Sequence, residues 1–261
     1  MGLELLSNAP ATQNNSKQPL LFVHGMWHGA WCWEPYFLPY FEHHGIKAYA
    51  LSLSNHANSP RRKPFNLLRI GDYVKDVRKV VNSLEQKPIL VGHSMGGFIV
   101  QKYLEKHDAP GAVLMASVPP YGVWGGTFSV LKKFPSTFLK ANLTLHLKHI
   151  INSPQRYRQI LCSNDFSNEE IVSCLEKIDT ESYLAYVDML GLNLVNTKKI
   201  KTPLLVLGGG KDATLPPKSV IKTAEKYKTK AVIFDDIPHM MMLSPDYKKV
   251  ADKIIDWIAS Y

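Results

Sequence analysis

A serine between glycines, directly behind an apolar run, is the feature that most constrains this chain. Residues 92–96 read Gly-His-Ser-Met-Gly and follow the apolar run Pro-Ile-Leu-Val at 88–91. Gly-x-Ser-x-Gly at the end of a strand is typical of a nucleophile elbow, a sharp turn that strains the serine backbone and projects its hydroxyl above a sheet. Because glycines have no side chain, the strand and the next helix can approach closely. The pattern predicts that Ser94 is a nucleophile if a base and an acid stand in suitable places.

Further apolar runs alternate with longer amphipathic segments. Leu67, Val74 and Val81, for example, fall on one face of a helical period. Continuous Val, Ile and Leu runs separated by helices indicate a parallel sheet buried on both faces. The predicted fold class is therefore α/β, with a mostly parallel central sheet flanked by helices. The expected strands are 20–23, 46–51, 89–92, 111–116, 204–207 and 231–234, and the expected helices are 30–43, 67–84, 217–227 and 246–259.

One stretch breaks this alternation. Residues 119–197 contain no clear strand and are dense in aromatic side chains. Helical patterns in this stretch fit an inserted lid rather than a continuation of the sheet. We therefore expect residues 1–118 and 198–261 to form the core, and residues 119–197 to form a mainly helical lid inserted in it.

Two residues that follow later predicted strands have side chains suited to activate Ser94. A general base must take the proton of Ser94 and return it to the leaving group, and histidine does this near neutral pH. Asp212 follows strand 204–207, and His239 follows strand 231–234. Open α/β sheets form their sites at the carboxyl ends of the strands. The chain order Ser94, Asp212, His239 predicts a catalytic triad in which Asp212 orients His239.

A developing oxyanion needs backbone N–H donors from two places. Residues 24–29, His-Gly-Met-Trp-His-Gly, follow the first strong strand. The expected donors are therefore the N–H groups of Met26 and Met95. His24 and His28 have the spacing of a helical metal site, but a strand-to-turn context does not favour a helix, and we expect no metal.

Composition and charge argue against several other classes of protein. The net charge is +9, but the lysines are scattered rather than gathered in an aromatic-interleaved stripe, so no nucleic-acid partner is expected. No apolar run reaches the length of about 18 residues that a membrane-spanning helix needs. The N-terminus does not resemble a signal peptide, and we expect a cytoplasmic protein that is a monomer or a homodimer. Cys32, Cys162 and Cys174 fit neither a disulfide framework nor a zinc spacing, and we expect them to be buried free thiols.

With these motifs, the chain resembles the α/β-hydrolase fold superfamily. The segment His-Gly-Met-Trp-His-Gly-Ala-Trp-Cys-Trp at 24–33 looks like that of plant methyl esterases and hydroxynitrile lyases, and of lysophospholipase-like esterases. The resemblance implies a Ser–His–Asp triad, with neither metal nor organic cofactor. Two segments depart from it. Residues 53–59 stand where relatives often have Gly-His-Gly-x-Ser, and the part before Leu20 is short and polar, so a remodelled loop and missing or irregular first strands are expected.

The resulting functional hypothesis is a serine hydrolase that cleaves a carboxylic ester of a small to medium apolar substrate through an acyl-enzyme. Its pocket is expected to include Trp27, Tyr121, Trp124 and Phe128. One alternative is a lyase, or a cofactor-free perhydrolase or haloperoxidase, with the same triad. A hydroxynitrile lyase would need a lysine near the histidine, and Lys211 is the candidate. A second alternative is a non-catalytic binder of a small molecule.

Overall fold

A seven-stranded sheet forms the centre of the part of the chain that the structure describes. The computed structural model describes residues 2–10, 18–62 and 64–260. The strand order is β1-β3-β2-β4-β5-β6-β7, and all neighbouring pairs are parallel except the antiparallel pair β1 and β3. The predicted fold class is confirmed. The strands are β1 (Leu5–Ser7), β2 (Leu20–Val23), β3 (Ala48–Leu51), β4 (Ile89–His93), β5 (Ala112–Met115), β6 (Leu204–Gly209) and β7 (Ala231–Phe234).

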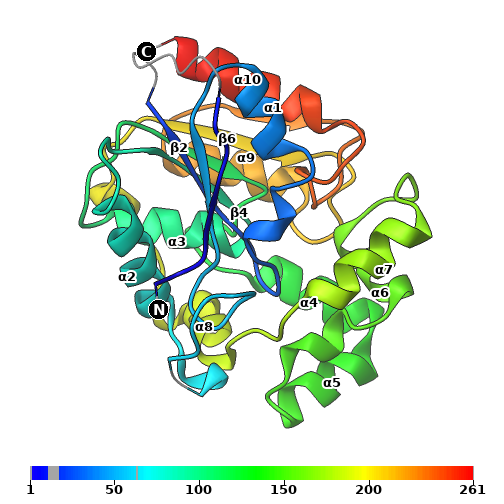
Figure 1. Ribbon diagram of the computed structural model, residues 1–261. Helices are drawn as coiled ribbons and strands as arrows, with labels where there is room; N and C mark the ends of the chain where they lie inside the picture. Colours follow the sequence, from blue (N-terminus) through cyan, green and yellow to red (C-terminus); the bar gives the residue numbers. More distant parts are fainter. Residues whose placement is uncertain (1, 11–17, 63, 261) are drawn as a thin grey trace.

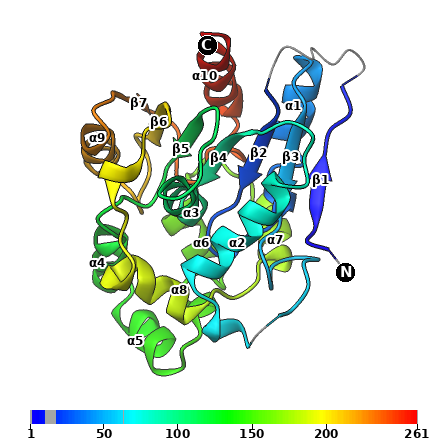
Figure 2. The same ribbon diagram turned by 90° about the vertical axis from the view of Figure 1, so that its left-hand side faces the viewer.

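Helices cover both faces of this sheet. Helices α1 and α10 pack against each other on one face, while α2 and α3 pack together on the other (Figures 1 and 2). Helix α9 lies against β6 and β7. Strands β2, β4 and β5 are fully buried, which explains why they read as unbroken apolar runs. The core helices are α1 (Phe37–His43), α2 (Ile70–Val81), α3 (Met95–Leu104), α9 (Pro217–Lys226) and α10 (Tyr247–Ala259).

Two expected helices are shorter than the sequence suggested. Between 30 and 43 there is a 3₁₀ turn at Ala30–Cys32 and then α1, which starts after Pro35. Pro39 is tolerated because it lies in the first turn of α1, where its missing N–H would have had no partner. Helix α2 starts at Ile70, and Leu67 lies in a preceding 3₁₀ turn with its side chain exposed instead of facing the core.

The first strand is present but short. β1 has three residues and pairs with β3 in the antiparallel direction, from Leu5 opposite Leu51 to Ser7 opposite Tyr49. Residues 11–17, which belong to the polar stretch noted in the sequence, lie outside the described residues. The expectation of irregular first strands is therefore met by one short, antiparallel edge strand before β2.

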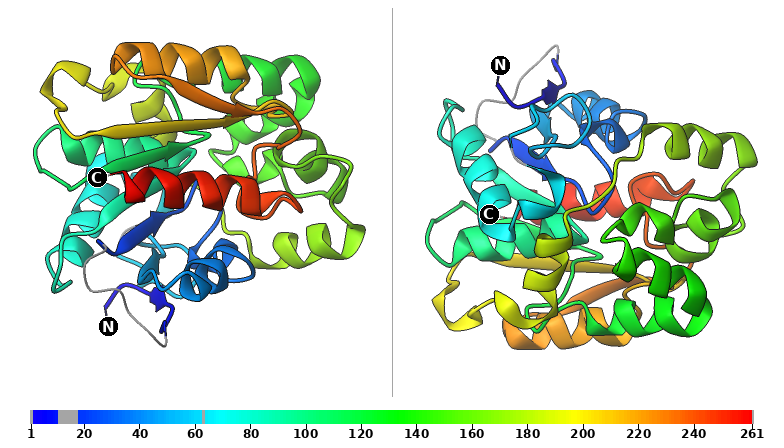
Figure 3. Two further views of the ribbon diagram at one scale, coloured as in Figure 1. Left: turned by 90° about the horizontal axis from the view of Figure 1, so that it is seen from above. Right: turned by 90° about the horizontal axis from the view of Figure 1, so that it is seen from below.

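The segment 119–197 connects β5 to β6, and we call it the helical insert. It is described throughout, and within it the structure assigns helices and turns but no strand. Figure 3 shows α4 to α7 gathered at one side of the molecule. Cys162 and Cys174 of the insert, like Cys32 of the core, are buried free thiols as predicted. The helices of the insert are α4 (Trp124–Lys133), α5 (Pro135–Leu143), α6 (Pro154–Leu161), α7 (Asn168–Lys177) and α8 (Tyr183–Val187).

Candidate active site

Ser94 occupies a strained turn between β4 and α3. Its φ of 53° and ψ of −119° lie in a region that residues with side chains rarely adopt. The Ser94 N–H donates to the carbonyl of Met115 at 3.1 Å, and the Ser94 carbonyl accepts from Val118 N–H at 3.0 Å. These bonds to the end of β5 hold the turn in place. The backbone therefore has the elbow geometry that the pentapeptide predicted.

Glycines are required where this turn touches its neighbours. A Cβ on Gly92 would lie 2.5 Å from the Gly96 carbonyl oxygen, and one on Gly96 would lie 2.2 Å from the Val23 carbonyl oxygen. Both distances are far below a van der Waals contact, and both neighbours are backbone atoms that cannot rotate away. The elbow is thus packed directly on the end of β2.

Gly96→Ala is expected to lower the free energy of unfolding by about 3 kcal/mol, because the methyl group forces α3 away from β2. Gly71→Ala in α2 is the matched control, since a Cβ there meets no heavy atom within 4 Å. In that helix position alanine should leave stability unchanged or raise it by about 0.5–1 kcal/mol. Urea unfolding of both variants measures the difference, and equal losses would contradict the packing described.

Asp212 and His239 lie side by side at the carboxyl edge of the sheet. His239 Nδ1 is 2.7 Å from Asp212 Oδ2, and both side chains are buried. The second oxygen, Oδ1, accepts the N–H groups of Thr214 and Leu215, each at 2.8 Å. An ionised carboxylate accepts all three bonds, so the proton shared with His239 sits on Nδ1. Nε2 of His239 is then free to act as a base.

His93, which directly precedes Ser94, holds the backbone of His239 in place by a hydrogen bond. Its Nε2–H donates to the carbonyl of His239 at 2.9 Å, and the two rings are 4.8 Å apart between centroids. Burial, together with the nearby His239 ring, holds the pKa of His93 well below 6.5, so this ring stays neutral. Nothing in the sequence points to a hydrogen-bond partner for His93 that lies 146 residues away.

The loop after β2 approaches Ser94 from the other side. A Cβ on Gly25 would lie 2.9 Å from the Ser94 Cβ, so only glycine permits this contact. His24 fixes the loop because its Nδ1–H donates to the Gly25 carbonyl and its Nε2 accepts the Leu53 N–H at 3.1 Å. His28 Nδ1–H likewise donates to the Met26 carbonyl at 2.7 Å. The bond to the Gly25 carbonyl orients the peptide that carries the Met26 N–H, and the bond to the Met26 carbonyl orients the peptide after it.

The Met95 N–H, the second predicted donor, lies at the start of a helix. Met95 is the first residue of α3, and an N–H at that position has no partner within its helix. The helix N-terminus also favours negative charge. Met26 and Ser94 line the same cavity, and Met95 directly follows Ser94. The role of their N–H groups as oxyanion donors stays a prediction.

A cavity of about 60 Å³ joins these parts to the helical insert. Ligand pockets usually measure about 300–1,000 Å³, so the present cavity has room for a small group only. Ser94, His239 and Met26 line it from the core. The remaining lining is mostly apolar, and it includes Val118, Val123, Val130, Phe138, Leu147, Ile150, Ile160, Leu161 and Leu215.

Of the four aromatic residues expected in the pocket, Trp27 lines the cavity. Tyr121, Trp124 and Phe128 do not, and these residues are 37%, 48% and 60% exposed to solvent. This corrects the sequence-based expectation. For Trp124 and Phe128 the reason is the rotation of α4, which turns Val123 and Thr127, the positions one before them, toward the cavity.

Comparison with known proteins places the chain in a family. The Alpha/beta hydrolase family profile matches residues 20–253. The chain belongs to the alpha/beta hydrolase family. Norfluorocurarine synthase 1 from Strychnos nux-vomica is 39% identical over 118 residues, which are 42% of each chain. Methylesterase 1 from Arabidopsis thaliana is 31% identical over 131 residues, or 48% of each chain. Each match spans less than half of the relative's length.

A solved structure has the same fold over a larger part of the chain than the sequence matches cover. Polyneuridine aldehyde esterase superposes on this alpha/beta hydrolase with a TM-score of 0.72, covering 92% of this chain and 98% of the other at 20% identity. At that identity the likeness shows the fold alone.

This hydrolase joins its insert to its core through a buried ion pair. His56 Nε2 is 3.1 Å from Glu181 Oε2, and both side chains are fully buried. Burial lowers the pKa of His56, but the Glu181 carboxylate and the Ser54 carbonyl outweigh it, and the pKa is raised above 6.5. Tyr73 donates to the other oxygen of Glu181 at 2.8 Å. His56 belongs to the loop 53–59 that follows β3.

The pair predicts a pH-dependent stability. Because the folded-state pKa of His56 is raised, its contribution is complete below about pH 6.5 and is lost as the pH rises through the folded value. Glu181→Gln is expected to lower the free energy of unfolding by about 3 kcal/mol at about pH 6, and by less at about pH 9. Denaturant unfolding at both pH values tests this, and a loss that does not change with pH would be the contrary result.

Proposed function

We propose that this alpha/beta hydrolase is a serine esterase. The observation that carries the proposal is the pairing of His239 with Asp212 at 2.7 Å, with His239 and the strained Ser94 lining one cavity. A histidine fixed by a carboxylate has an unprotonated nitrogen to offer, which a nucleophilic serine needs. The chain order Ser94, Asp212, His239 and their position at the carboxyl edge of the sheet support this proposal.

In the proposed acylation, Ser94 Oγ attacks the carbonyl carbon of the ester while its proton passes to His239 Nε2. The carbonyl oxygen gains the negative charge and is stabilised by the N–H groups of Met26 and Met95. The ester C–O bond then breaks, and the alcohol leaves with the proton from His239. Asp212 stabilises the imidazolium that exists in between.

Deacylation repeats these steps with water. His239 takes a proton from water, the hydroxide attacks the acyl carbon, and the bond to Ser94 Oγ breaks. The proton returns to Ser94, and the carboxylic acid is released. All atoms balance in these two steps, with the ester and water as the reactants.

The substrate class follows from the lining of the cavity. An apolar wall and a volume of about 60 Å³ suit a short acyl or small alcohol group. A methylesterase name among the relatives agrees with a small alcohol. The helical insert supplies most of this wall, and in the proposal it acts as a lid that selects the substrate. The cytoplasmic location and the monomeric or homodimeric state stay predictions from the sequence.

The lyase alternative lacks the residue that motivated it. Lys211 Nζ lies 3.2 Å from Asp236 and 3.7 Å from Asp165, on a half-exposed side chain. Among the described residues that line the cavity there is no lysine. An amine held by surface carboxylates cannot assist His239 in removing a proton from a cyanohydrin.

A panel of p-nitrophenyl esters tests the proposed function. We expect turnover of the acetate and butyrate, with kcat/KM at least about tenfold lower for the octanoate because its chain exceeds the cavity. Cyanide release from a cyanohydrin without ester turnover would instead support the lyase. Tight ligand binding with neither reaction would support the non-catalytic binder.

A further inference from the structure

The outer faces of α4 and α5 carry exposed apolar side chains. Trp124, Phe128 and Leu131 follow one face of α4 at helical spacing, and Leu139 and Leu143 do so on α5, where 59% and 76% of their surfaces are exposed. The two helices pack against each other, so we call these five residues together the outer apolar face. Val130 and Phe138 of the same helices point the other way and line the cavity.

This apolar exposure is concentrated. Among the described residues, twelve large hydrophobic side chains are exposed, and six of them fall between Trp124 and Leu145. Single exposed apolar residues are ordinary, whereas a group of them marks a surface that contacts something apolar. Helix α5 lies at the end of the molecule opposite α10, so this face is free of the core (Figures 1 and 2).

The charges around the outer apolar face have one sign. Residues 109–164 contain no Asp or Glu, and Lys132, Lys133 and Lys140 are exposed on α4 and α5. A basic amphipathic helix with Trp, Phe and Leu on its apolar face is typical of a surface that lies on a membrane. Lysine is depleted in protein–protein interfaces, which favours lipid over a protein partner.

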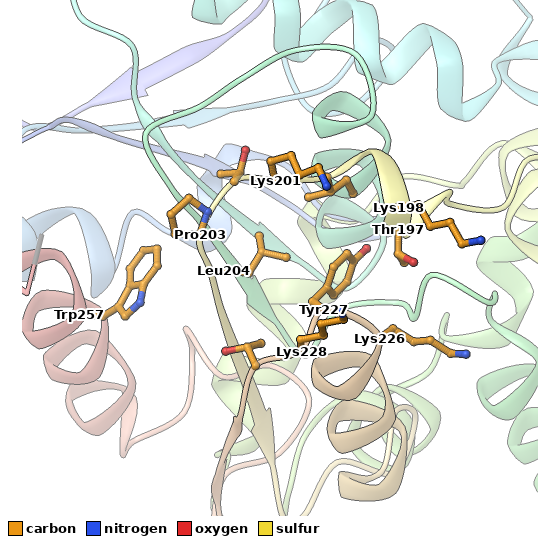
Figure 4. A pocket seen from close by; sticks show the side chains of 12 residues that line it. Thr197, Lys198, Lys201, Pro203, Leu204, Lys226, Tyr227, Lys228 and Trp257 are labelled. Carbon is orange, nitrogen blue, oxygen red and sulfur yellow. The ribbon is translucent and has the colours of Figure 1, made fainter.

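A second basic region supplies the comparison. Lys198, Lys201, Lys226 and Lys228 line a groove of about 580 Å³ at the start of β6 (Figure 4). The amino end of β6 is the edge of the sheet away from Ser94. Leu204 and Trp257 line this groove, but neither is among the exposed large apolar residues. The groove therefore has the charge of the outer apolar face without its apolar side chains.

We propose that the outer apolar face of α4 and α5 docks on an anionic lipid surface. Phe128, Leu139 and Leu143 enter the boundary between headgroups and acyl chains, and Lys132, Lys133 and Lys140 contact anionic headgroups. Among the described residues no helix is long and apolar enough to cross a bilayer. The contact is therefore peripheral, and it places the cavity on the inner side of α4 and α5 close to the lipid.

Vesicle flotation tests the proposal with the full chain. We expect the protein to float with vesicles of phosphatidylcholine mixed with phosphatidylserine, and to do so less as the salt concentration rises. The triple variant Lys132→Gln, Lys133→Gln, Lys140→Gln should bind about 100-fold more weakly, since each lysine near such a surface contributes about fivefold. Phe128→Ser, Leu139→Ser, Leu143→Ser should lose at least about tenfold.

Matched variants at other sites show whether binding needs the outer apolar face or only positive charge and exposed apolar side chains anywhere on the surface. Lys198→Gln, Lys201→Gln, Lys226→Gln removes three charges from the groove, and Leu67→Ser, Val172→Ser, Ile221→Ser removes three exposed apolar residues outside the face. Both should bind like the wild type. Binding lost in the groove variant and kept in the α4–α5 variants would overturn the proposal, as would no binding by the wild type.

A second readout starts from the wild-type protein and needs only one conservative variant. Brominated lipids quench tryptophans that enter the bilayer, and the quenching should disappear in Trp124→Phe. Quenching that persists undiminished in this variant would place the contact elsewhere. Ser94→Ala should float like the wild type, so vesicle binding can succeed or fail independently of the proposed esterase activity.

Discussion

Replacing Ser94 by Ala is expected to lower the kcat of ester hydrolysis by about 10⁶-fold, close to the loss that serine hydrolases show when the nucleophile is removed. The variant loses the only atom that forms the acyl-enzyme in the proposed mechanism, while the elbow glycines and their contacts with β2 remain. Initial rates with p-nitrophenyl acetate measure the loss, and unchanged thermal unfolding shows that the fold is intact.

Ser117 offers a matched control for this substitution. It is buried, and its Oγ lies where a Cβ on Gly97 would come within 2.3 Å, so it packs against the same turn. It is not among the residues that line the cavity. Ser117→Ala should therefore keep kcat within a few-fold of the wild type. Similar losses in both variants would mean that packing at the elbow, rather than a nucleophile, accounts for the activity.

Asp212→Asn is expected to lower kcat by about 10⁴-fold, as the loss of a triad carboxylate does. The local hydrogen bonds explain why the asparagine amide cannot replace the Asp212 carboxylate. Oδ1 accepts the N–H groups of Thr214 and Leu215, so the asparagine oxygen should take that place and direct its NH₂ group at His239. His239 then accepts on Nδ1 and carries its proton on Nε2, where it cannot take one from Ser94.

The carboxylates on the loop before His239 supply the control for Asp212. Asp235 and Asp236 are exposed, and Asp236 pairs with Lys211. Asp236→Asn removes the same charge close to His239 in sequence and should change kcat by only a few-fold. Steady-state kinetics on both variants decide between them, and a larger loss in Asp236→Asn would show that Asp212 has been assigned the wrong role.

The sheet and the core of the site could be read from the sequence because their determinants are local. Gly92 and Gly96 around Ser94 specify a turn, and the apolar runs before Asp212 and His239 specify strands that end at the same edge. The order of these segments then brings distant residues together. The strand predictions are confirmed to within two residues at either end.

The pocket wall could not be read in this way. Whether Phe128 or Thr127 faces the cavity depends on the rotation of α4, and one residue changes the direction by about a quarter turn. Hydrophobicity favoured the aromatic residue, but the structure exposes it. His56 and Glu181 were missed for a similar reason, since a buried ion pair between residues 125 positions apart leaves no periodic pattern.

The most direct test of the proposed function is labelling with a fluorophosphonate, followed by mass spectrometry of the peptides. The proposed mechanism predicts one adduct on Ser94, formed by the wild type and slowed strongly in His239→Ala, because the probe reacts with a serine whose proton is taken by a base. An adduct on another residue, or no adduct on the folded wild-type protein, would contradict the assignment of Ser94, His239 and Asp212 as a catalytic triad.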